Sequence, residues 1–182
     1  MKKKILVIAL AVMAISLVGY GTLAWFTSQD TANNTITTGD IEIQVNETMI
    51  DDGEEVPYVD PTDTLVPGTT SSKIVCVENT GSDAAYVRVK LDVAFDDEEL
   101  STDVISLNLN TTNWTYSNGY YYYNSILQPG DETEDLFDSY TFSTSAGNEY
   151  ASAELSIDVN AYAVQSDNNG TSALTATGWP TV

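Results

Sequence analysis

Residues 84–95 alternate strictly between two kinds of side chain. One set of positions carries Val87, Val89, Leu91, Val93 and Phe95, and the positions between them carry Tyr86, Arg88, Lys90 and Asp92. A period of two places each set on its own face of a strand, so the segment predicts a strand with one buried and one solvent-facing side. On the outer face we expect Arg88 and Lys90 to pair with carboxylates of a neighbouring strand.

Similar alternation and short apolar runs recur along the chain between turn residues. Strands are expected at 40–46, 72–79, 105–109, 114–116, 120–123, 140–143 and 153–165. Asn118-Gly119 lies between two aromatic strands and is typical of a tight hairpin, because both residues tolerate positive φ. No long segment has the 3.6-residue period of a helix. The sequence therefore predicts a single all-β domain at 39–182, an antiparallel sandwich or jelly roll.

Acidic residues dominate the charge of the chain. It has 6 basic and 27 acidic residues, a net charge of −21, and without Lys2, Lys3 and Lys4 the net charge is −24. Such a charge repels nucleic acid and anionic lipid, so neither is an expected partner of the domain. We expect residues 47–63 to form an irregular loop, because Pro57 and Pro61 interrupt it. The acidic runs at 51–55, 96–99 and 131–135 are expected to be solvated loops, with calcium binding as the alternative.

The residue types available for catalysis are few. The chain has no histidine, which excludes histidine-based triads and H-E-x-x-H zinc sites. Its single cysteine, Cys76, lies among apolar residues and is expected to be a small core residue, with an intermolecular or reactive thiol as the alternative. We assign no catalytic residue, no metal ligand and no cofactor, and we expect no enzyme activity. A carboxylate pair of the glycosidase type is the open alternative.

The first 24 residues have the three parts of a secretory signal peptide. Lys2 to Lys4 form a basic start, residues 5–18 are almost wholly apolar, and small residues follow up to Ala24. This predicts cleavage between Ala24 and Trp25 and a secreted protein. The alternative is an uncleaved membrane anchor that continues to Phe26, although the apolar run is shorter than the roughly 20 residues needed to span a bilayer.

Two aromatic stretches call for a partner or a core. Residues 25–38 begin with Trp25 and Phe26 and continue with polar residues rich in threonine and asparagine, so they have little to bury within their own domain.

Tyr120 to Tyr123 form a continuous run in which two rings are expected to face the core and two to face outward. An exposed adhesive surface is the alternative for these tyrosines.

Several motifs resemble the TasA/camelysin family. They are Gly21-Thr22-Leu23-Ala24-Trp25-Phe26-Thr27, Ile36-Thr37-Thr38-Gly39-Asp40-Ile41-Glu42-Ile43, Val66-Pro67-Gly68, Val77-Glu78-Asn79-Thr80-Gly81-Ser82 and Ala85-Tyr86-Val87-Arg88-Val89. The resemblance implies export from a Gram-positive cell, cleavage by a SipW-type signal peptidase and a place in the biofilm matrix. It also implies fibres built by donor-strand exchange, in which residues 25–38 fill a groove of the next copy and Trp25 and Phe26 anchor them.

These expectations give one main hypothesis and two alternatives. The main hypothesis is a secreted structural protein of the cell surface or extracellular matrix, with further copies of itself as a head-to-tail partner and other matrix proteins as additional partners. The first alternative is a monomeric calcium- or carbohydrate-binding module. The second is a hydrolase, because members of the family are sometimes labelled metallopeptidases, a label that no residue pattern in this chain supports.

Overall fold

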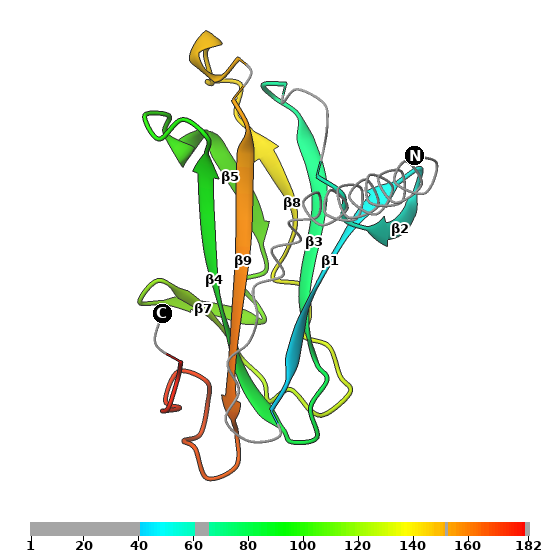
Figure 1. The fold of residues 1–182 in the computed structure, drawn as a ribbon, viewed down its shortest axis with the longest axis vertical. Coiled ribbons are helices and arrows are strands. Elements are labelled where there is room, and N and C mark those ends of the chain that lie inside the picture. The colour runs from blue at the N-terminus through cyan, green and yellow to red at the C-terminus, as the bar shows by residue number, and fades with distance from the viewer. Residues whose placement is uncertain (1–40, 61–65, 152, 181–182) are drawn as a thin grey trace, which may run out of the picture. The chain divides into compact units, whose positions relative to one another are not determined.

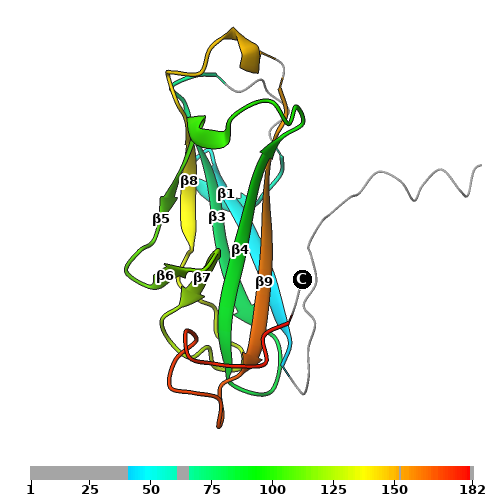
Figure 2. The same ribbon diagram turned by 90° about the vertical axis from the view of Figure 1, so that its left-hand side faces the viewer.

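A computed structural model describes residues 41–60, 66–151 and 153–180, in which nine strands form two antiparallel sheets (Figures 1 and 2). The first sheet has the order β2-β1-β3-β8-β5 and the second has the order β6-β7-β4-β9. The strands are β1 (Ile43–Asp51), β2 (Glu54–Pro57), β3 (Thr70–Asn79), β4 (Ala85–Phe95), β5 (Ile105–Leu109), β6 (Trp114–Ser117), β7 (Tyr120–Tyr123), β8 (Phe137–Phe142) and β9 (Leu155–Gln165). The helical residues of this part of the chain are two short 3-10 turns, Thr102–Val104 and Asn148–Tyr150. The predicted all-β antiparallel architecture is confirmed.

The strand predicted from strict alternation is β4, the central long strand of the second sheet. It pairs antiparallel with β9 along its whole length, from Ala85 opposite Gln165 to Phe95 opposite Leu155. Val87 and Val89 are fully buried on its inner face. The predicted inner side of this strand is therefore confirmed where the two sheets pack together.

The hairpin predicted at Asn118-Gly119 joins β6 to β7. Ser117 lies opposite Tyr120, and the two turn residues have φ angles of 51° and 86°. Asparagine and glycine adopt positive φ at low cost, which explains the two-residue turn.

The acidic segment that was expected to be an irregular loop forms a second hairpin, so that prediction was wrong. β1 continues to Asp51 and pairs with β2 from Thr48 opposite Pro57 to Asp51 opposite Glu54. Asp52 and Gly53 form the turn, with φ angles of 49° and 86°. Asp-Gly is a strong hairpin signal, and Pro57 is tolerated because it ends a short edge strand.

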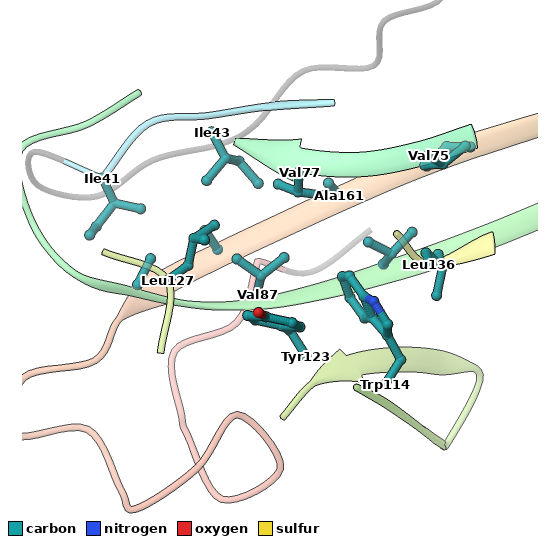
Figure 3. Close-up of a cluster of buried hydrophobic side chains, with 14 of the residues drawn as sticks. Ile41, Ile43, Val75, Val77, Val87, Trp114, Tyr123, Leu127, Leu136 and Ala161 are labelled. Carbon is teal, nitrogen blue, oxygen red and sulfur yellow. The ribbon is translucent and has the colours of Figure 1, made fainter. Parts of the chain in front are cut away.

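The main core lies between the two sheets. Figure 3 shows side chains from both sheets pointing toward one another. The cluster includes Ile41, Ile43, Val75, Val77, Val87, Val89, Trp114, Tyr123, Leu127, Leu136, Phe137, Val159, Ala161 and Ala163. A smaller cluster forms around Phe95 and Phe142, where the Tyr150 ring packs edge-on at 5.2 Å and 5.8 Å from their centroids. The apolar faces of the strands thus supply most of the residues of the main core.

Cys76 does not belong to this core, so the expectation of a core cysteine was wrong. Val75 and Val77 face inward and are 0% and 1% exposed, whereas Cys76 lies between them on the outer face of β3 and is half-buried. It stands opposite Asn46 of β1. Strand alternation puts consecutive residues on opposite faces, so Cys76 cannot share the inner face with Val75 and Val77.

The outer face of the second sheet is covered by the segment that follows β9, residues 166–180. Figure 2 shows this segment, in red, passing across the lower ends of β4 and β9. Its Ala173, Ala176 and Trp179 pack with Tyr86, Tyr122 and Val164 in a separate apolar cluster. We call residues 166–180 the C-terminal strap. Because of it, Tyr86 and Tyr122 are buried on a face that the sequence predicted to be in water.

Arg88 lies beneath the strap and does not form the ion pair predicted for it. Its guanidinium carbon is 3.9 Å from the Tyr120 ring centroid and 4.7 Å from that of Trp179, and Nη2 donates to the Pro180 carbonyl at 3.0 Å. Aromatic faces therefore take the place of a carboxylate. Lys90 does pair with a carboxylate, but with Asp92 of its own strand at 2.8 Å. Neither Arg88 nor Lys90 therefore forms the predicted ion pair with a carboxylate of a neighbouring strand.

Candidate functional site at an unpaired strand edge

β9 is an 11-residue strand that ends the second sheet. One of its sides pairs with β4, and no strand in the described part of the chain pairs with the other. A free edge presents unpaired backbone N–H and C=O groups, which is the surface that another strand needs in order to join a sheet. The outer side of β9 is therefore the candidate functional site.

The phase of the β4–β9 ladder identifies the backbone groups on this edge. Ser166 N donates to Ala84 O at 2.9 Å, and Asp96 N donates to Glu154 O at 3.0 Å, one bond at each end of β9. Hydrogen-bonded and non-bonded pairs alternate in an antiparallel ladder, so the even-numbered residues of β9 direct their backbone N–H and C=O groups toward β4. The outward backbone groups consequently belong to Leu155, Ile157, Val159, Ala161, Ala163 and Gln165. None of these residues is charged, and together they present an edge of about 36 Å.

The other sheet ends are poorer templates for strand addition. β2 has four residues, including Glu54, Glu55 and Pro57. β6 also has four residues, and β5 has five, with an irregular register between Leu107 and Leu109. Charge, proline, short length and irregular register are the features by which proteins protect sheet edges. β9 is long, regular in register and without proline, and its one charged residue, Asp158, has backbone groups that bond toward β4.

Partly buried apolar side chains lie beside this edge. β1 and β9 are neighbours at their lower ends, where Ile43 and Ala161 share the main core, and β1 then rises away from β9 (Figures 1 and 2). Ile43 and Val159 are each only 6% exposed. Val45, two residues after Ile43, and Ile157, two residues before Val159, also face inward but are only partly buried. Apolar surface is thus left open next to unpaired backbone groups.

The first sheet carries an ion pair beyond Val45. Lys73 Nζ lies 2.8 Å from Glu47 Oε2 and 3.7 Å from the Tyr58 ring centroid. The Lys73 side chain is 4% exposed and that of Glu47 is 32% exposed. Burial, helped by Tyr140 and by the carboxylates of Asp60 and Glu47, raises the pKa of Tyr58 well above its usual range. β1 therefore changes from apolar at Val45 to polar at Glu47.

Most of the cations of the described domain are internal, which leaves its surface strongly acidic. Lys73 and Arg88 are buried, and Lys90, with 39% of its side chain exposed, is held by Asp92. The acidic residues are mostly exposed. Copies of the domain consequently repel one another unless the contact itself carries little charge.

The sequence-predicted site residues Ala24, Trp25 and Phe26 lie outside the described residues, so signal cleavage and strand donation stay predictions. The sequence predicted a strand at 153–165 with its inner face, and β9 confirms both. Its place at the end of a sheet was missed. Sheet order depends on which distant strands pair, and no local pattern in β9 encodes that order.

The acidic runs are not all free loops. Residues 51–55 form the turn of the β1–β2 hairpin, and Asp97 and Glu99 lie in a bend. The run at 131–135 is bound to β3: Thr133 N donates to Val77 O at 2.9 Å, and Thr133 Oγ1 accepts from Val77 N at 3.0 Å. Glu134 accepts a hydrogen bond from the Tyr123 hydroxyl. The expectation of a wholly solvated loop was wrong for this third run.

The described residues offer few side chains that could bind a metal ion together. Within 41–60, 66–151 and 153–180, no three residues of the types His, Cys, Asp and Glu are grouped so that they could hold one. Burial and the carboxylates of Glu132, Asp135, Glu55 and Glu78 raise the pKa of Cys76 to about 12, so its thiol stays protonated at neutral pH. Zinc in peptidases is bound by histidine and carboxylate ligands, and this chain has no histidine. The described residues do not fit a catalytic zinc site.

No helix among the described residues is long and apolar enough to cross a membrane.

Comparison with known proteins gives one match. A family model described as camelysin metallo-endopeptidase matches residues 1–111, more than half of the chain. No curated protein and no solved structure matches the chain. The description points toward a peptidase and hence toward a metal, for which the described residues provide no suitable donor set. The matched residues include the motifs at 21–27, 36–43, 66–68 and 77–89, and the chain belongs to the camelysin metallo-endopeptidase family, that is, the TasA/camelysin family.

Proposed function

We propose that this protein is an exported structural component of the cell surface or extracellular matrix whose copies join by strand addition. Residues 25–38 of one copy would add to the outer edge of β9 in the next. The observation that carries this proposal is the 11-residue edge of β9, with which no described strand pairs, beside half-buried apolar side chains. Strand addition supplies backbone hydrogen bonds for affinity and side-chain alternation for register.

The composition of residues 25–38 suits them to this role. Fourteen extended residues span about 46 Å, enough to cover the roughly 36 Å of β9. Threonine favours strands, and Asp30 is the only charged residue in the segment. In a chain with 27 acidic residues, such a segment can approach another copy with little electrostatic repulsion.

The same contact explains how assembly would be controlled. A tail that binds the edge of the next copy is a head-to-tail contact that does not close, so it produces filaments. Cleavage between Ala24 and Trp25 by a SipW-type signal peptidase would release the tail. Export and assembly would then be coupled, because the uncut chain keeps its basic, apolar leader attached to the segment that must enter a neighbour.

A peptidase is the second candidate, and the family description is the observation that favours it. Its test is casein and gelatin zymography of the purified protein, with and without a chelator. We expect no cleared band, because a catalytic zinc would lack its usual ligands. A chelator-sensitive band that co-purifies with the protein would replace the structural proposal with an enzymatic one.

The structural proposal is tested by comparing two chains, residues 25–182 and residues 39–182. Negative-stain microscopy and size-exclusion chromatography should show filaments and large oligomers for the longer chain and monomers for the shorter, with the same circular dichroism. Replacing both aromatic residues, Trp25→Ser with Phe26→Ser, should act like the truncation, with Thr27→Ser as the matched control. Monomers from the longer chain under all conditions would instead favour a monomeric binding module.

A further inference from the structure

We propose that the outer face of the second sheet binds a neutral polysaccharide next to the C-terminal strap. The surface is made of three partly exposed aromatic rings and three polar side chains beside them: Tyr120, Tyr162, Trp179, Lys90, Asp92 and Asn160. This binding function goes beyond structural assembly and does not depend on it, because the side chains of the outer face are separate from the backbone edge of β9.

Strand pairing brings these side chains together on one face. Asn160 of β9 stands opposite Lys90 of β4, and Tyr162 stands opposite Arg88. On the other side of β4, continuing the register of Arg88 with β7 by two residues puts Tyr120 next to Lys90. Cross-strand neighbours on one face are about 5 Å apart. A polymer that lies across β7, β4 and β9 therefore meets Tyr120, Lys90 and Asn160 in succession.

The three rings, which we call the aromatic patch, are held in place by Arg88. The guanidinium carbon of Arg88 lies 3.9 Å from the ring centroid of Tyr120, 5.4 Å from that of Tyr162 and 4.7 Å from that of Trp179. Tyr120 and Tyr162 also pack edge to face, with centroids 5.9 Å apart. All three rings are nevertheless partly exposed. Side chains that are fixed before a ligand arrives lose little conformational entropy when it binds.

The polar side chains beside the aromatic patch offer both donors and acceptors. Lys90 Nζ lies 2.8 Å from both carboxylate oxygens of Asp92, and Asn160 Nδ2 donates to Asp92 Oδ2 at 3.4 Å. The side chains of Lys90 and Asp92 are 39% and 47% exposed. An ammonium has three donors and a carboxylate about four acceptor positions, so these contacts leave capacity on both groups. A hydroxyl group, which donates one hydrogen bond and also accepts, can use both.

Aromatic rings next to such polar groups suit a sugar. A pyranose ring has a face of C–H groups that can stack on an aromatic ring, and its rim carries hydroxyls. Ligand sites in general combine apolar and aromatic surface with a few polar groups that fix the orientation of the ligand. Because the aromatic patch lies on a sheet face with neighbours on three strands, it suits a stretch of polymer more than a single sugar.

Charge decides which kind of polysaccharide fits. Lys90 and Asp92 neutralise each other, and the rest of the domain surface is strongly acidic. That surface repels polyanions, including polymers of uronic acids. A neutral polymer is not repelled, and its contacts with tyrosine and asparagine should depend little on salt. We therefore assign a neutral polysaccharide built of pyranose rings.

Binding of soluble polysaccharides to the immobilised full chain tests this assignment. The chain is fixed at low density on a biosensor, so that assembly does not affect the signal. The neutral probes are hydroxyethyl cellulose, mixed-linkage β-glucan and galactomannan, and the anionic probe is carboxymethyl cellulose, which shares its backbone with the first. We expect at least one neutral polymer to bind equally well in low and moderate sodium chloride, and carboxymethyl cellulose to bind weakly or not at all.

Matched substitutions locate the surface. Tyr162→Ala should weaken binding of the responding polymer at least about tenfold, because it removes a stacking ring, and Tyr162→Phe should restore most of it. The control is Tyr116→Ala, expected to change binding less than about twofold. Tyr116 has a ring that is 63% exposed, and it lies two residues from the buried Trp114, on the other face of the second sheet. Folding of each variant is checked by circular dichroism.

A second pair of variants avoids the aromatic rings. Asn160→Ala should weaken binding about threefold or more, because it removes a hydrogen-bonding group. Its control is Asn108→Ala on the first sheet, whose amide donates to Asp138 at 2.9 Å. If Tyr162→Ala does not fold, this pair decides the location.

Each outcome supports or overturns the assignment. Failure of every neutral polymer to bind would overturn it, and binding of carboxymethyl cellulose alone would overturn the choice of a neutral ligand. Equal losses in Tyr162→Ala and Tyr116→Ala, or in Asn160→Ala and Asn108→Ala, would place the binding surface elsewhere. Filament formation is measured separately, so a failure of assembly leaves the polysaccharide site standing and a failure of binding leaves the proposed function standing.

Discussion

The guanidinium carbon of Arg88 lies 4.7 Å from the ring centroid of Trp179, so the first half of β4 holds the C-terminal strap against the outer face of the second sheet. Two tyrosines complete the surroundings, with ring centroids at 3.9 Å for Tyr120 and 5.4 Å for Tyr162. Arg88 Nε has no hydrogen-bond partner, so the rings and the Pro180 carbonyl hold the guanidinium. Cation–π contacts are strongest when the cation is shielded from water, as it is here.

Replacing Arg88 should therefore destabilise the fold. We expect Arg88→Ala to lower the free energy of unfolding by about 2 kcal/mol, because it removes the stacking and the hydrogen bond to the strap. Arg88→Lys should recover only part of this, since an ammonium lacks the planar stacking surface. Urea unfolding measures the effect, with Lys90→Ala as the control. An equal loss in Lys90→Ala, whose side chain is half-exposed, would show that the strap contributes little.

The hydrogen bond from Tyr123 to Glu134 should make stability depend on pH in the acid range. This bond lowers the pKa of Glu134, so the stabilisation is present above the usual glutamate pKa and is lost as the pH falls through the lowered value. We expect Tyr123→Phe to reduce the free energy of unfolding by about 1 kcal/mol at pH 7 and progressively less on acidification. Tyr116→Phe, with a ring that is 63% exposed, is the control. A difference between Tyr123→Phe and the unsubstituted chain that persists at pH 2 would contradict this origin.

Cys76 should be an unreactive thiol in the folded protein. Its pKa is raised from 9.0 to about 12, first by burial and then by neighbouring carboxylates. At pH 8 the thiolate fraction should be about three orders of magnitude below that of an unperturbed thiol, and reaction with a disulfide reagent should slow accordingly. Unfolding in urea should restore the ordinary rate. Fast labelling of the native protein would mean that the outer face of β3 opens readily.

Assembly should accelerate with ionic strength. Copies with a net charge of −21, or −24 after the predicted cleavage, repel one another at long range, and salt screens this repulsion within a Debye length of about 8 Å at physiological ionic strength. Light scattering from low to moderate sodium chloride should show a shorter lag and faster growth. Calcium at equal ionic strength serves as the comparison, and a much larger effect of calcium would indicate specific binding. A rate that does not respond to salt would mean that the repulsive surfaces stay far apart in the filament.

The sequence predicted the elements whose information is local. The alternation in β4, the Asn118-Gly119 turn and the apolar face of β9 follow from side-chain periodicity and backbone preference, and the structure contains all three. The β1–β2 hairpin was not predicted, because Pro57 and Pro61 indicate an irregular loop. Pro57 in fact ends a short edge strand, and Asp52-Gly53 forms the turn.

What the sequence could not provide are contacts between distant residues. The outer face of β4 looked solvent-exposed because Arg88 and Lys90 are charged, and nothing near them indicates that the strap returns to cover Arg88. The strap itself has no periodicity that would predict packing. Likewise, the inner face of β9 could be predicted, but its position at the end of a sheet depends on strand pairing across the whole domain. The site is therefore a property of topology more than of motif.

The long pairing of β4 with β9 also sets when the outer edge of β9 forms during folding. Ala85 and Gln165 stand opposite one another although 79 residues separate them in the chain, and bringing such distant segments together carries a large loop-closure entropy. Topologies dominated by distant contacts fold slowly. Under the proposed function, a polypeptide exported N-terminus first would present residues 25–38 long before β9 has emerged and docked. Each new chain would then offer its tail to a finished neighbour before it is able to accept one, which would give filament growth an intrinsic direction.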